Sequence, residues 1–200
     1  GFDTTPDWIS THTGIYSRHF ASADQNTGDL AAAAGVAALA SAGMRPSELQ
    51  RILVCTTSPN WLSPATACDV QRILGADCPS SDVQSACASF LFGLDAAYRM
   101  VRTAVEPILV IGADIKSRFV SRGDRALGSV FSDGAGAFIL GSGQSGGIRD
   151  IVLWSDGRFA RNLFTPAGGS DLPASRQTVE KDLHSTQMRI PGREIAEHAK

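Results

Sequence analysis

Short apolar runs alternate along the chain with longer segments in which apolar residues recur at helical spacing. Runs of about four to eight aliphatic and β-branched residues are typical of buried strands, whereas apolar positions three and four apart are typical of helices with one buried face. The strands are predicted at residues 51–58, 107–114, 134–141 and 148–157. The helices are predicted at residues 30–42 and 63–75 and after Cys87. This alternation predicts an α/β fold with a largely parallel central sheet.

The ends of the predicted helices carry residues that favour those positions. Thr27 is a good N-cap for the alanine-rich helix that follows it, and Gly43 is expected to end that helix. Pro64 suits the first turn of the second helix, which is expected to end at Gly75. Residues 158–186 are polar and rich in Gly, Pro and Ser, so we expect a loop-rich segment there.

The stretch DVQSACASFLFGLDAAYRM, residues 82–100, places a cysteine where a short strand meets an apolar helix. From Cys87 onward the apolar residues fall at helical spacing and predict one buried face. They are Phe90, Leu91, Leu94, Ala97, Tyr98 and Val101. We therefore expect Cys87 at or just before a helix N-terminus, with small residues on both sides that leave space around its sulfur.

This position of Cys87 indicates a nucleophile. Free N–H groups and the helix dipole stabilise an anion at a helix N-terminus, and a thiolate is such an anion. In open α/β sheets, active sites form beyond the carboxyl ends of the strands, and Cys87 directly follows a predicted strand. The alternative is that Cys87 is simply a small buried residue, because free cysteine is often buried.

Composition and charge narrow the function further. The 200 residues suffice for a substantial core, as one domain or two small ones, and the net charge of −2 gives no reason to expect nucleic acid as a partner. No run of 18 apolar residues is present, so we expect no membrane span. The four cysteines lack the spacing of a metal site, and without a secretory signal we expect reduced thiols in a cytoplasm. The chain begins Gly-Phe-Asp, which indicates either processing or numbering that starts inside a longer chain.

Four ordered motifs resemble those of β-ketoacyl-acyl carrier protein synthase III. They are DTTPDWISTHTGIYSRH at 3–19, CTTS with PATACDVQRILG at 55–75, DVQSACASF at 82–90, and LVIGAD with GDRALGSVFSDGAGAFIL at 109–140. The resemblance implies a thiolase-like fold, in which two similar α/β halves stack as α-β-α-β-α layers. It implies that residues 1–200 are the N-terminal half and that the C-terminal half is not in this sequence. It also implies a homodimer, because the N-terminal halves of that family meet across its interface.

The same resemblance implies a role for Cys87. In that family the cysteine takes an acyl group from an acyl-CoA as a thioester. Malonyl-acyl carrier protein then condenses with the thioester, losing carbon dioxide, to give a 3-oxoacyl product in fatty acid or polyketide biosynthesis. This chemistry implies acyl-CoA and acyl carrier protein as partners, without a metal or cofactor.

The family also uses a histidine and an asparagine, in H-Q-A-N and G-N-T-S motifs that these 200 residues lack. None of the four histidines present is a credible substitute. They are His12, His19, His184 and His198. We therefore expect residues 1–200 alone to be inactive in condensation, either as a fragment of a longer chain or as one part of a split enzyme.

By position in the motifs, the resemblance implies residues that contact CoA: Thr4, Trp8, His12 and Arg125. An aromatic face suits a purine, and a guanidinium pairs well with phosphate. The alternative for Trp8 is an ordinary half-buried aromatic residue. The alternative for Arg125 is a solvated cluster with Arg118 and Arg122, and we assign the latter two to the surface.

Three residues depart from the family pattern. His12 replaces an arginine that contacts CoA, and a neutral imidazole holds phosphate more weakly than a guanidinium does. Ser89 and Ser132 replace glycines in the nucleophile motif and in the F-G-D-G motif. These changes suggest a divergent member, in polyketide or secondary metabolism.

The resemblance further implies an acyl pocket that involves Ser63 and Phe131. In that family a phenylalanine at the position of Ser63 often closes the acyl pocket of the partner subunit. The smaller serine therefore predicts room for a longer or bulkier starter. The alternative is that Trp61 or Leu62 fills the space, because protein interiors leave few voids.

Two other functions stay open at this point. One is cysteine-dependent acyl transfer to an oxygen, nitrogen or sulfur acceptor without decarboxylation. The other is a non-catalytic half that serves only in dimerisation. Decarboxylation of a malonyl thioester distinguishes the first from condensation, and acylation of Cys87 distinguishes the second from both enzymes.

Overall fold

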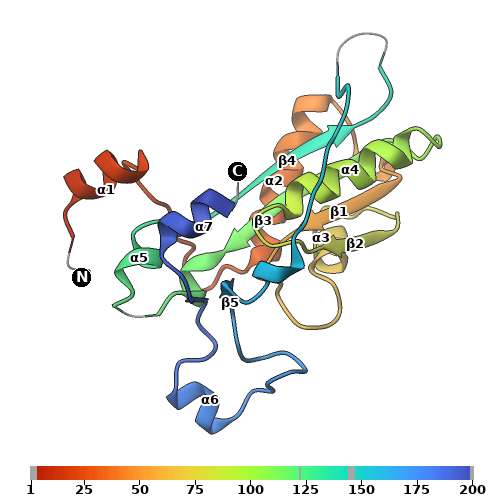
Figure 1. The fold of residues 1–200 in the computed structure, drawn as a ribbon. Coiled ribbons are helices and arrows are strands. Elements are labelled where there is room, and N and C mark those ends of the chain that lie inside the picture. The colour runs from red at the N-terminus through yellow and green to blue at the C-terminus, as the bar shows by residue number, and fades with distance from the viewer. Residues whose placement is uncertain (1–3, 122, 144–146, 199–200) are drawn as a thin grey trace. The chain divides into compact units, whose positions relative to one another are not determined.

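The computed structural model describes residues 4–121, 123–143 and 147–198, and its main sheet has four strands. Their order is β2 (Ser80–Val83), β1 (Arg51–Cys55), β3 (Ile108–Ile115) and β4 (Asp133–Leu140), as Figure 1 shows. The first three strands are parallel, and β4 runs antiparallel to β3. The α/β prediction is confirmed, and the sheet is mixed because of its edge strand β4. The carboxyl ends of β1, β2 and β3 consequently lie along one edge of the sheet.

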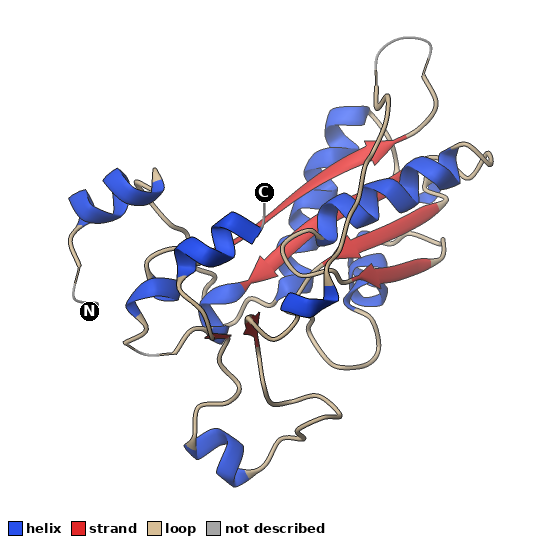
Figure 2. Ribbon diagram, in the orientation of Figure 1, coloured by secondary structure: helices blue, strands red, loops and turns tan. Residues whose placement is uncertain are grey.

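Helices cover both faces of this sheet (Figure 2). Alternate strand residues point to opposite faces, so β1 and β3 each contribute to two apolar clusters. The first cluster packs against α2 (Thr27–Ala42) and α3 (Thr66–Leu74), with Ile52, Val54, Leu109 and Ile111 from the strands. The second cluster packs against α4 (Ser89–Val101), with Leu53, Cys55, Ile108 and Val110.

The start of α2 differs from the prediction. The helix begins at Thr27, and its N-cap is Asn26, so the predicted cap at Thr27 is wrong. The Asn26 side chain accepts the N–H of Asp29, and the Asp29 carboxylate accepts the N–H of Asn26 in return. This reciprocal arrangement satisfies two N–H groups that would otherwise lack partners. Gly43 ends the helix with a φ of 64°, as predicted.

Two further elements are shorter than predicted: α3 starts later and β1 ends earlier than the sequence suggested. α3 begins at Thr66, after Ser63 and Pro64, because the Asp82 carboxylate accepts the N–H groups of Thr66 and Ala67 at 2.7 and 2.8 Å. An acidic group favours that end of a helix through the helix dipole. β1 ends at Cys55, so residues 56–58 form a loop in place of the predicted strand.

Residues 148–157 do not form the predicted strand. Val152 is 86% exposed and Trp154 is 75% exposed, and no strand pairs with them in the described part of the chain. The alternation of apolar residues in this segment was misleading, because its apolar side chains do not pack against a core.

Residues 158–186 contain only short elements, as expected of a loop-rich segment. They are η3 (Gly157–Phe159, which starts one residue earlier), β5 (Leu163–Phe164) and α6 (Arg176–Glu180). β5 pairs antiparallel with β6 (Gln187–Met188).

The described residues form two compact units. The sheet unit comprises residues 20–115 and 133–153, and contains the main sheet, α2, α3, α4 and η1 (Pro46–Glu48). The second unit draws on residues 1–19, 116–132 and 154–200. It contains α1 (Pro6–Thr13), η2 (Lys116–Phe119), α5 (Arg125–Gly128), β5, β6, α6 and α7 (Gly192–His198). Within the described ranges, no helix is long and apolar enough to cross a membrane.

Candidate active site

Cys87 lies in the turn that carries the chain from β2 into α4. β2 ends at Val83, α4 begins at Ser89, and Cys87 immediately precedes the N-cap residue Ala88. The thiol is exposed. The predicted place just before a helix N-terminus is therefore confirmed, and the alternative of a small buried residue is excluded.

The turn around Cys87 is closed by the side chain of Ser89. Its hydroxyl accepts the N–H of Ser85 at 2.8 Å and donates to the carbonyl of Ala86 at 2.6 Å. Two backbone bonds of 3.1 Å complete the turn, from the N–H of Ala88 to Ser85 and from the N–H of Ser89 to Ala86. Ala86 has a φ of 50°, in the left-handed region. The substitution of serine for the motif glycine thus supplies hydrogen bonds that a glycine could not make.

The face that α4 buries agrees with the prediction except at one position. Ala97 is buried, and Phe90 and Val101 pack against the second cluster, while Leu91, which was expected to be buried, is 52% exposed. The most deeply buried positions are the small residues Ser89, Gly93 and Ala97. Gly93 is required because a β-carbon there would collide with the sulfur of Cys55 on β1. The spacing of small residues at every fourth position was the signal in the sequence for this close helix–sheet contact.

Next to this turn, the loop after β1 is anchored by Asp114, which the sequence analysis did not single out. One carboxylate oxygen of Asp114 accepts the hydroxyls of Thr56, Thr57 and Ser58 and the N–H of Thr57, at 2.8 to 3.2 Å. The Ser58 hydroxyl oxygen also accepts the N–H of Ile115 at 2.8 Å. These bonds fix the carboxyl ends of β1 and β3 to each other. Short polar residues at the ends of two predicted strands were the available signal.

The other three cysteines have distinct surroundings. Burial raises the pKa of the Cys55 thiol to about 12, with the negative charge of Asp82 adding to the effect. Burial likewise raises the pKa of Cys78. Cys68 is exposed on α3 and accepts a weak hydrogen bond from the Ser80 hydroxyl at 3.7 Å. Cys68 and Cys87 are therefore the two accessible thiols among the four.

In the second unit, three of the residues implied for CoA form one aromatic and cationic cluster. The rings of Trp8 and His12 stack with centroids 4.4 Å apart, and the guanidinium of Arg125 lies 4.7 Å from the centroid of Trp8. The Nδ1–H of His12 donates to the carbonyl of Trp8 at 2.8 Å. Trp8 is 38% exposed, and its ring contacts both nitrogen-rich neighbours. We name this set of three residues the Trp8 cluster.

Thr4, the fourth residue implied for CoA, and the residues assigned to the surface lie outside the Trp8 cluster. The hydroxyl of Thr4, just before α1, is buried and has no hydrogen-bond partner among the described residues. Arg118 is exposed, as predicted, and Arg122 lies outside the described residues. His184 contacts the Thr178 hydroxyl at 2.9 Å, and His198 lies in α7.

The two residues implied for the acyl pocket lie in different units. Ser63 is exposed, together with Trp61 (49% exposed) and Leu62 (89% exposed), so none of these three side chains is buried in this chain. Phe131 is half-buried in the second unit, and the ammonium of Lys116 lies 5.8 Å from its ring centroid. Lys116 also lies 5.1 Å from the ring of Phe119.

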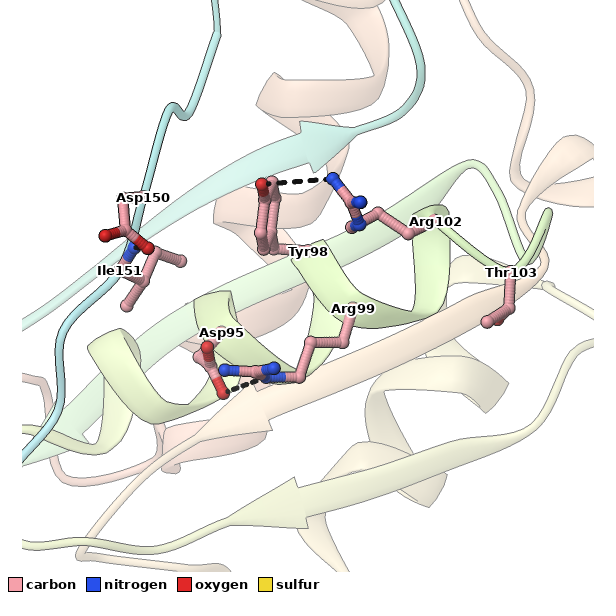
Figure 3. A pocket seen from close by; sticks show the side chains of 7 residues that line it. All are labelled: Asp95, Tyr98, Arg99, Arg102, Thr103, Asp150 and Ile151. Carbon is pink, nitrogen blue, oxygen red and sulfur yellow. Dashed lines mark hydrogen bonds and ion pairs between the residues drawn. The ribbon is translucent and has the colours of Figure 1, made fainter.

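A polar hollow of about 660 Å³ lies beside the carboxyl-terminal half of α4, at the opposite end of the helix from Cys87 (Figure 3). An ion pair of 2.9 Å joins Arg99 to Asp95, and the guanidinium of Arg102 lies over the ring of Tyr98. The charges of Arg99 and Asp95 in this hollow therefore neutralise each other. None of the residues singled out from the sequence as catalytic or CoA-binding lines it.

Comparison with known proteins gives consistent matches. The family model for 3-oxoacyl-[acyl-carrier-protein] synthase III matches residues 81–157. The β-ketoacyl-[acyl-carrier-protein] synthase III of Caldanaerobacter subterraneus subsp. tengcongensis is 42% identical over 200 residues, which cover 98% of this chain and 60% of the relative. The enzyme of the same name from Clostridioides difficile is 40% identical, over 93% of this chain and 57% of the relative. The chain therefore spans about three fifths of the length of the curated relatives it matches.

Solved structures agree with these matches. The β-ketoacyl-[acyl carrier protein] synthase III of Thermus thermophilus superposes with a TM-score of 0.85 at 30% identity, over 100% of this chain and 61% of that one. The priming β-ketosynthase of the R1128 polyketide pathway superposes with a TM-score of 0.84 at 29% identity, over 97% of this chain and 57% of that one. The fold is accordingly thiolase-like, as predicted.

Proposed function

We propose that the chain is the N-terminal half of a β-ketoacyl-acyl carrier protein synthase III, and that Cys87 is the acyl-accepting nucleophile of this decarboxylative condensing enzyme. The observation that carries the proposal is the exposed thiol in the β2–α4 turn. An exposed cysteine just before a helix, at the carboxyl edge of parallel strands, has the position that active-site residues take in such sheets.

The proposed reaction has two stages. The Cys87 thiolate attacks the carbonyl carbon of an acyl-CoA, the C–S bond to CoA breaks, and CoA leaves as its thiolate and takes up a proton. Malonyl-acyl carrier protein then loses carbon dioxide, and the resulting carbanion attacks the Cys87 thioester. The Cys87 thiolate leaves, and the product is a 3-oxoacyl-acyl carrier protein. This nucleophilic chemistry needs no metal or redox cofactor.

The names of the matched proteins support this choice of reaction. The curated relatives are β-ketoacyl-acyl carrier protein synthases, and one structural neighbour primes a polyketide pathway. We propose acyl-CoA or an acyl carrier protein as the acyl donor and malonyl-acyl carrier protein as the extender. The pathway is the initiation of fatty acid or polyketide synthesis, with the protein in the cytoplasm and as a homodimer.

The Trp8 cluster supports a binding site for the nucleotide end of CoA. An indole face stacks on a purine, and the guanidinium of Arg125 pairs with phosphate. The Arg125 guanidinium lies within cation–π distance of the Trp8 ring. A purine that stacks on this face of Trp8 therefore displaces the guanidinium. His12 and the buried hydroxyl of Thr4 are the further contacts that we propose there.

The acyl pocket that we propose includes Phe131, and Ser63 acts from the partner subunit. Because Ser63 and its neighbours Trp61 and Leu62 are exposed in this chain, they are available at a dimer interface. A serine in place of a phenylalanine leaves space for a longer starter. Each methylene buried there adds about 0.8 kcal/mol of apolar contact.

The test separates condensation from simple acyl transfer. Full-length protein is incubated with a panel of acyl-CoA and acyl-carrier donors and with malonyl-acyl carrier protein, and both 3-oxoacyl product and carbon dioxide are measured. We expect equal amounts of the two products from the wild type and none from Cys87→Ala, whereas Cys68→Ala, the other accessible thiol, retains activity. Acyl transfer without carbon dioxide release would instead support the transferase alternative, and no acylation of Cys87 by any donor would refute both enzymes.

A further inference from the structure

We propose that Ser89 is a positioning residue, which holds the Cys87 thiol in place by closing the turn around it. The catalytic part of this inference rests on the proposed function of Cys87. The geometric part rests on the turn itself, in which a single buried hydroxyl joins the residues on the strand side of the cysteine. Ser89 is 4% exposed, so its hydroxyl is shielded from competing water.

The hydroxyl acts on two neighbouring peptide groups at once. It accepts the N–H of Ser85 at 2.8 Å and donates to the carbonyl of Ala86 at 2.6 Å. A hydroxyl is the smallest side-chain group that can donate and accept in this way. Alanine or glycine at position 89 would leave both of these partly buried groups without their side-chain partner, and threonine would retain the hydroxyl.

Ala86 needs such support because of its backbone conformation. Its φ of 50° lies in the left-handed region, which is unfavourable for a residue with a β-carbon. The bond from Ser89 to the Ala86 carbonyl fixes the peptide that links Ala86 to Cys87. Since this peptide sets the direction in which the cysteine side chain leaves the backbone, the hydroxyl determines where the sulfur lies relative to α4.

For the rate of acyl transfer, the position of the sulfur matters more than its exposure does. An attacking atom must lie close to the acyl carbon and in line with it, and a displacement of about 1 Å can cost on the order of 10²-fold in rate. Loss of the Ser89 hydroxyl therefore lowers the rate constant of acylation while it leaves binding of the acyl-CoA unchanged. A role confined to stability would lower the folded fraction and leave the rate per folded molecule unaltered.

The experiment compares Ser89→Ala and Ser89→Thr with the wild type, all as full-length protein. Acylation of Cys87 is measured with increasing acyl-CoA, and the folded fraction is taken from denaturant unfolding. For Ser89→Ala we expect kcat for acylation per folded molecule to fall about 10- to 100-fold with KM unchanged. Ser89→Thr retains kcat within about threefold if the hydroxyl is what matters.

Thr103→Ala is the matched control. The Thr103 hydroxyl donates to the carbonyl of Met100, three residues earlier, in the same way as Ser89 donates to Ala86, but just beyond the carboxyl end of α4. We expect its acylation rate to equal that of the wild type. An equal loss in Thr103→Ala and Ser89→Ala would show a general effect on the helix and overturn the proposal.

A second readout does not depend on the enzyme activity. Iodoacetamide alkylates both accessible thiols, so the rate at Cys87 is divided by the rate at Cys68 in the same chain. We expect this ratio at pH 7 to fall more than about threefold in Ser89→Ala and to stay constant in Ser89→Thr, because the sulfur no longer keeps its fixed, exposed position in the turn. An unchanged ratio in Ser89→Ala overturns the inference, whatever happens to acylation. A wild type that no donor acylates, but whose ratio falls as expected in Ser89→Ala, refutes the proposed function alone.

Discussion

Cys55 and Cys87 lie at the carboxyl ends of two neighbouring parallel strands, yet their surroundings are opposite. Cys55 is the last residue of β1 and is 2% exposed, with its sulfur against Gly93 of α4. Cys87 lies four residues beyond the end of β2 and is exposed. The strand register pairs Cys55 with Val83, the last residue of β2. Continuing the chain by one short turn is thus enough to bring a thiol from the core to the surface.

The comparison shows that position, and not residue type, separates a buried thiol from an accessible one. Burial holds Cys55 in its neutral form, since it raises the pKa of that thiol to about 12. A neutral thiol packs like a small apolar side chain and reacts slowly. The turn beyond β2 instead leaves Cys87 exposed, and the following predictions test this contrast.

The largest expected effect is on alkylation. At pH 8, a thiol with a pKa of about 12 is ionised to only about one part in 10⁴, and Cys55 is also shielded from the reagent. We expect iodoacetamide to modify Cys87 at least about 10³-fold faster than Cys55 in the native protein. Peptide mass spectrometry over time measures both rates, and the exposed Cys68 serves as the internal reference. Similar rates at Cys55 and Cys87 in folded protein would remove the contrast.

A smaller effect is expected when the packing around Cys55 is disturbed. The added methyl group in Gly93→Ala would collide with the Cys55 sulfur, and overpacking of this kind typically costs about 1–3 kcal/mol of unfolding free energy. Gly134→Ala is the control, because a β-carbon at Gly134 meets nothing within 4 Å. Denaturant unfolding measures both variants.

The double variant Gly93→Ala with Cys55→Ala sharpens the same test. Removing the sulfur makes room for the methyl group, so we expect the double variant to be more stable than the sum of the two single changes predicts, by about 1 kcal/mol or more. Additive losses would mean that the sulfur of Cys55 does not limit the approach of α4.

The smallest effect is a change of stability with pH. The unfolded chain releases the Cys55 proton near its ordinary pKa of 9.0, whereas the folded chain retains it up to about 12. The stabilisation is therefore complete below pH 9 and is lost as the pH rises from 9 towards 12. Between pH 8.5 and 10.5 we expect this thiol to account for a loss of about 1–2 kcal/mol. Cys55→Ala should show a correspondingly shallower decline in denaturant unfolding, and identical slopes would contradict the assigned role of burial.

Local pattern was sufficient to predict much of the fold. The apolar runs located β1, β3 and β4, and helical spacing located α4, so the place of Cys87 before a helix was accessible from the sequence. Gly43 and Gly75 were correctly expected to end helices, because each takes the left-handed conformation that glycine adopts readily.

The contacts that shape the site were not accessible in this way, because they join distant residues. Asp114 binds a loop that lies more than 50 positions earlier in the chain, and no periodicity reports such a bond. Asp82 likewise sets the start of α3 from a different strand. Leu91 fitted the helical pattern but is exposed, because close packing against Cys55 selected small residues for the buried stripe.

The most direct test of the account is the identity of the acylated residue. Full-length protein is incubated with acyl-CoA and acyl-carrier donors from acetyl to octanoyl, digested, and mapped by peptide mass spectrometry. The account predicts one thioester adduct, on Cys87, which is absent from Cys87→Ala and present in Cys68→Ala. An adduct on Cys55, Cys68 or Cys78 that persists in Cys87→Ala would contradict the assignment of Cys87 as the nucleophile.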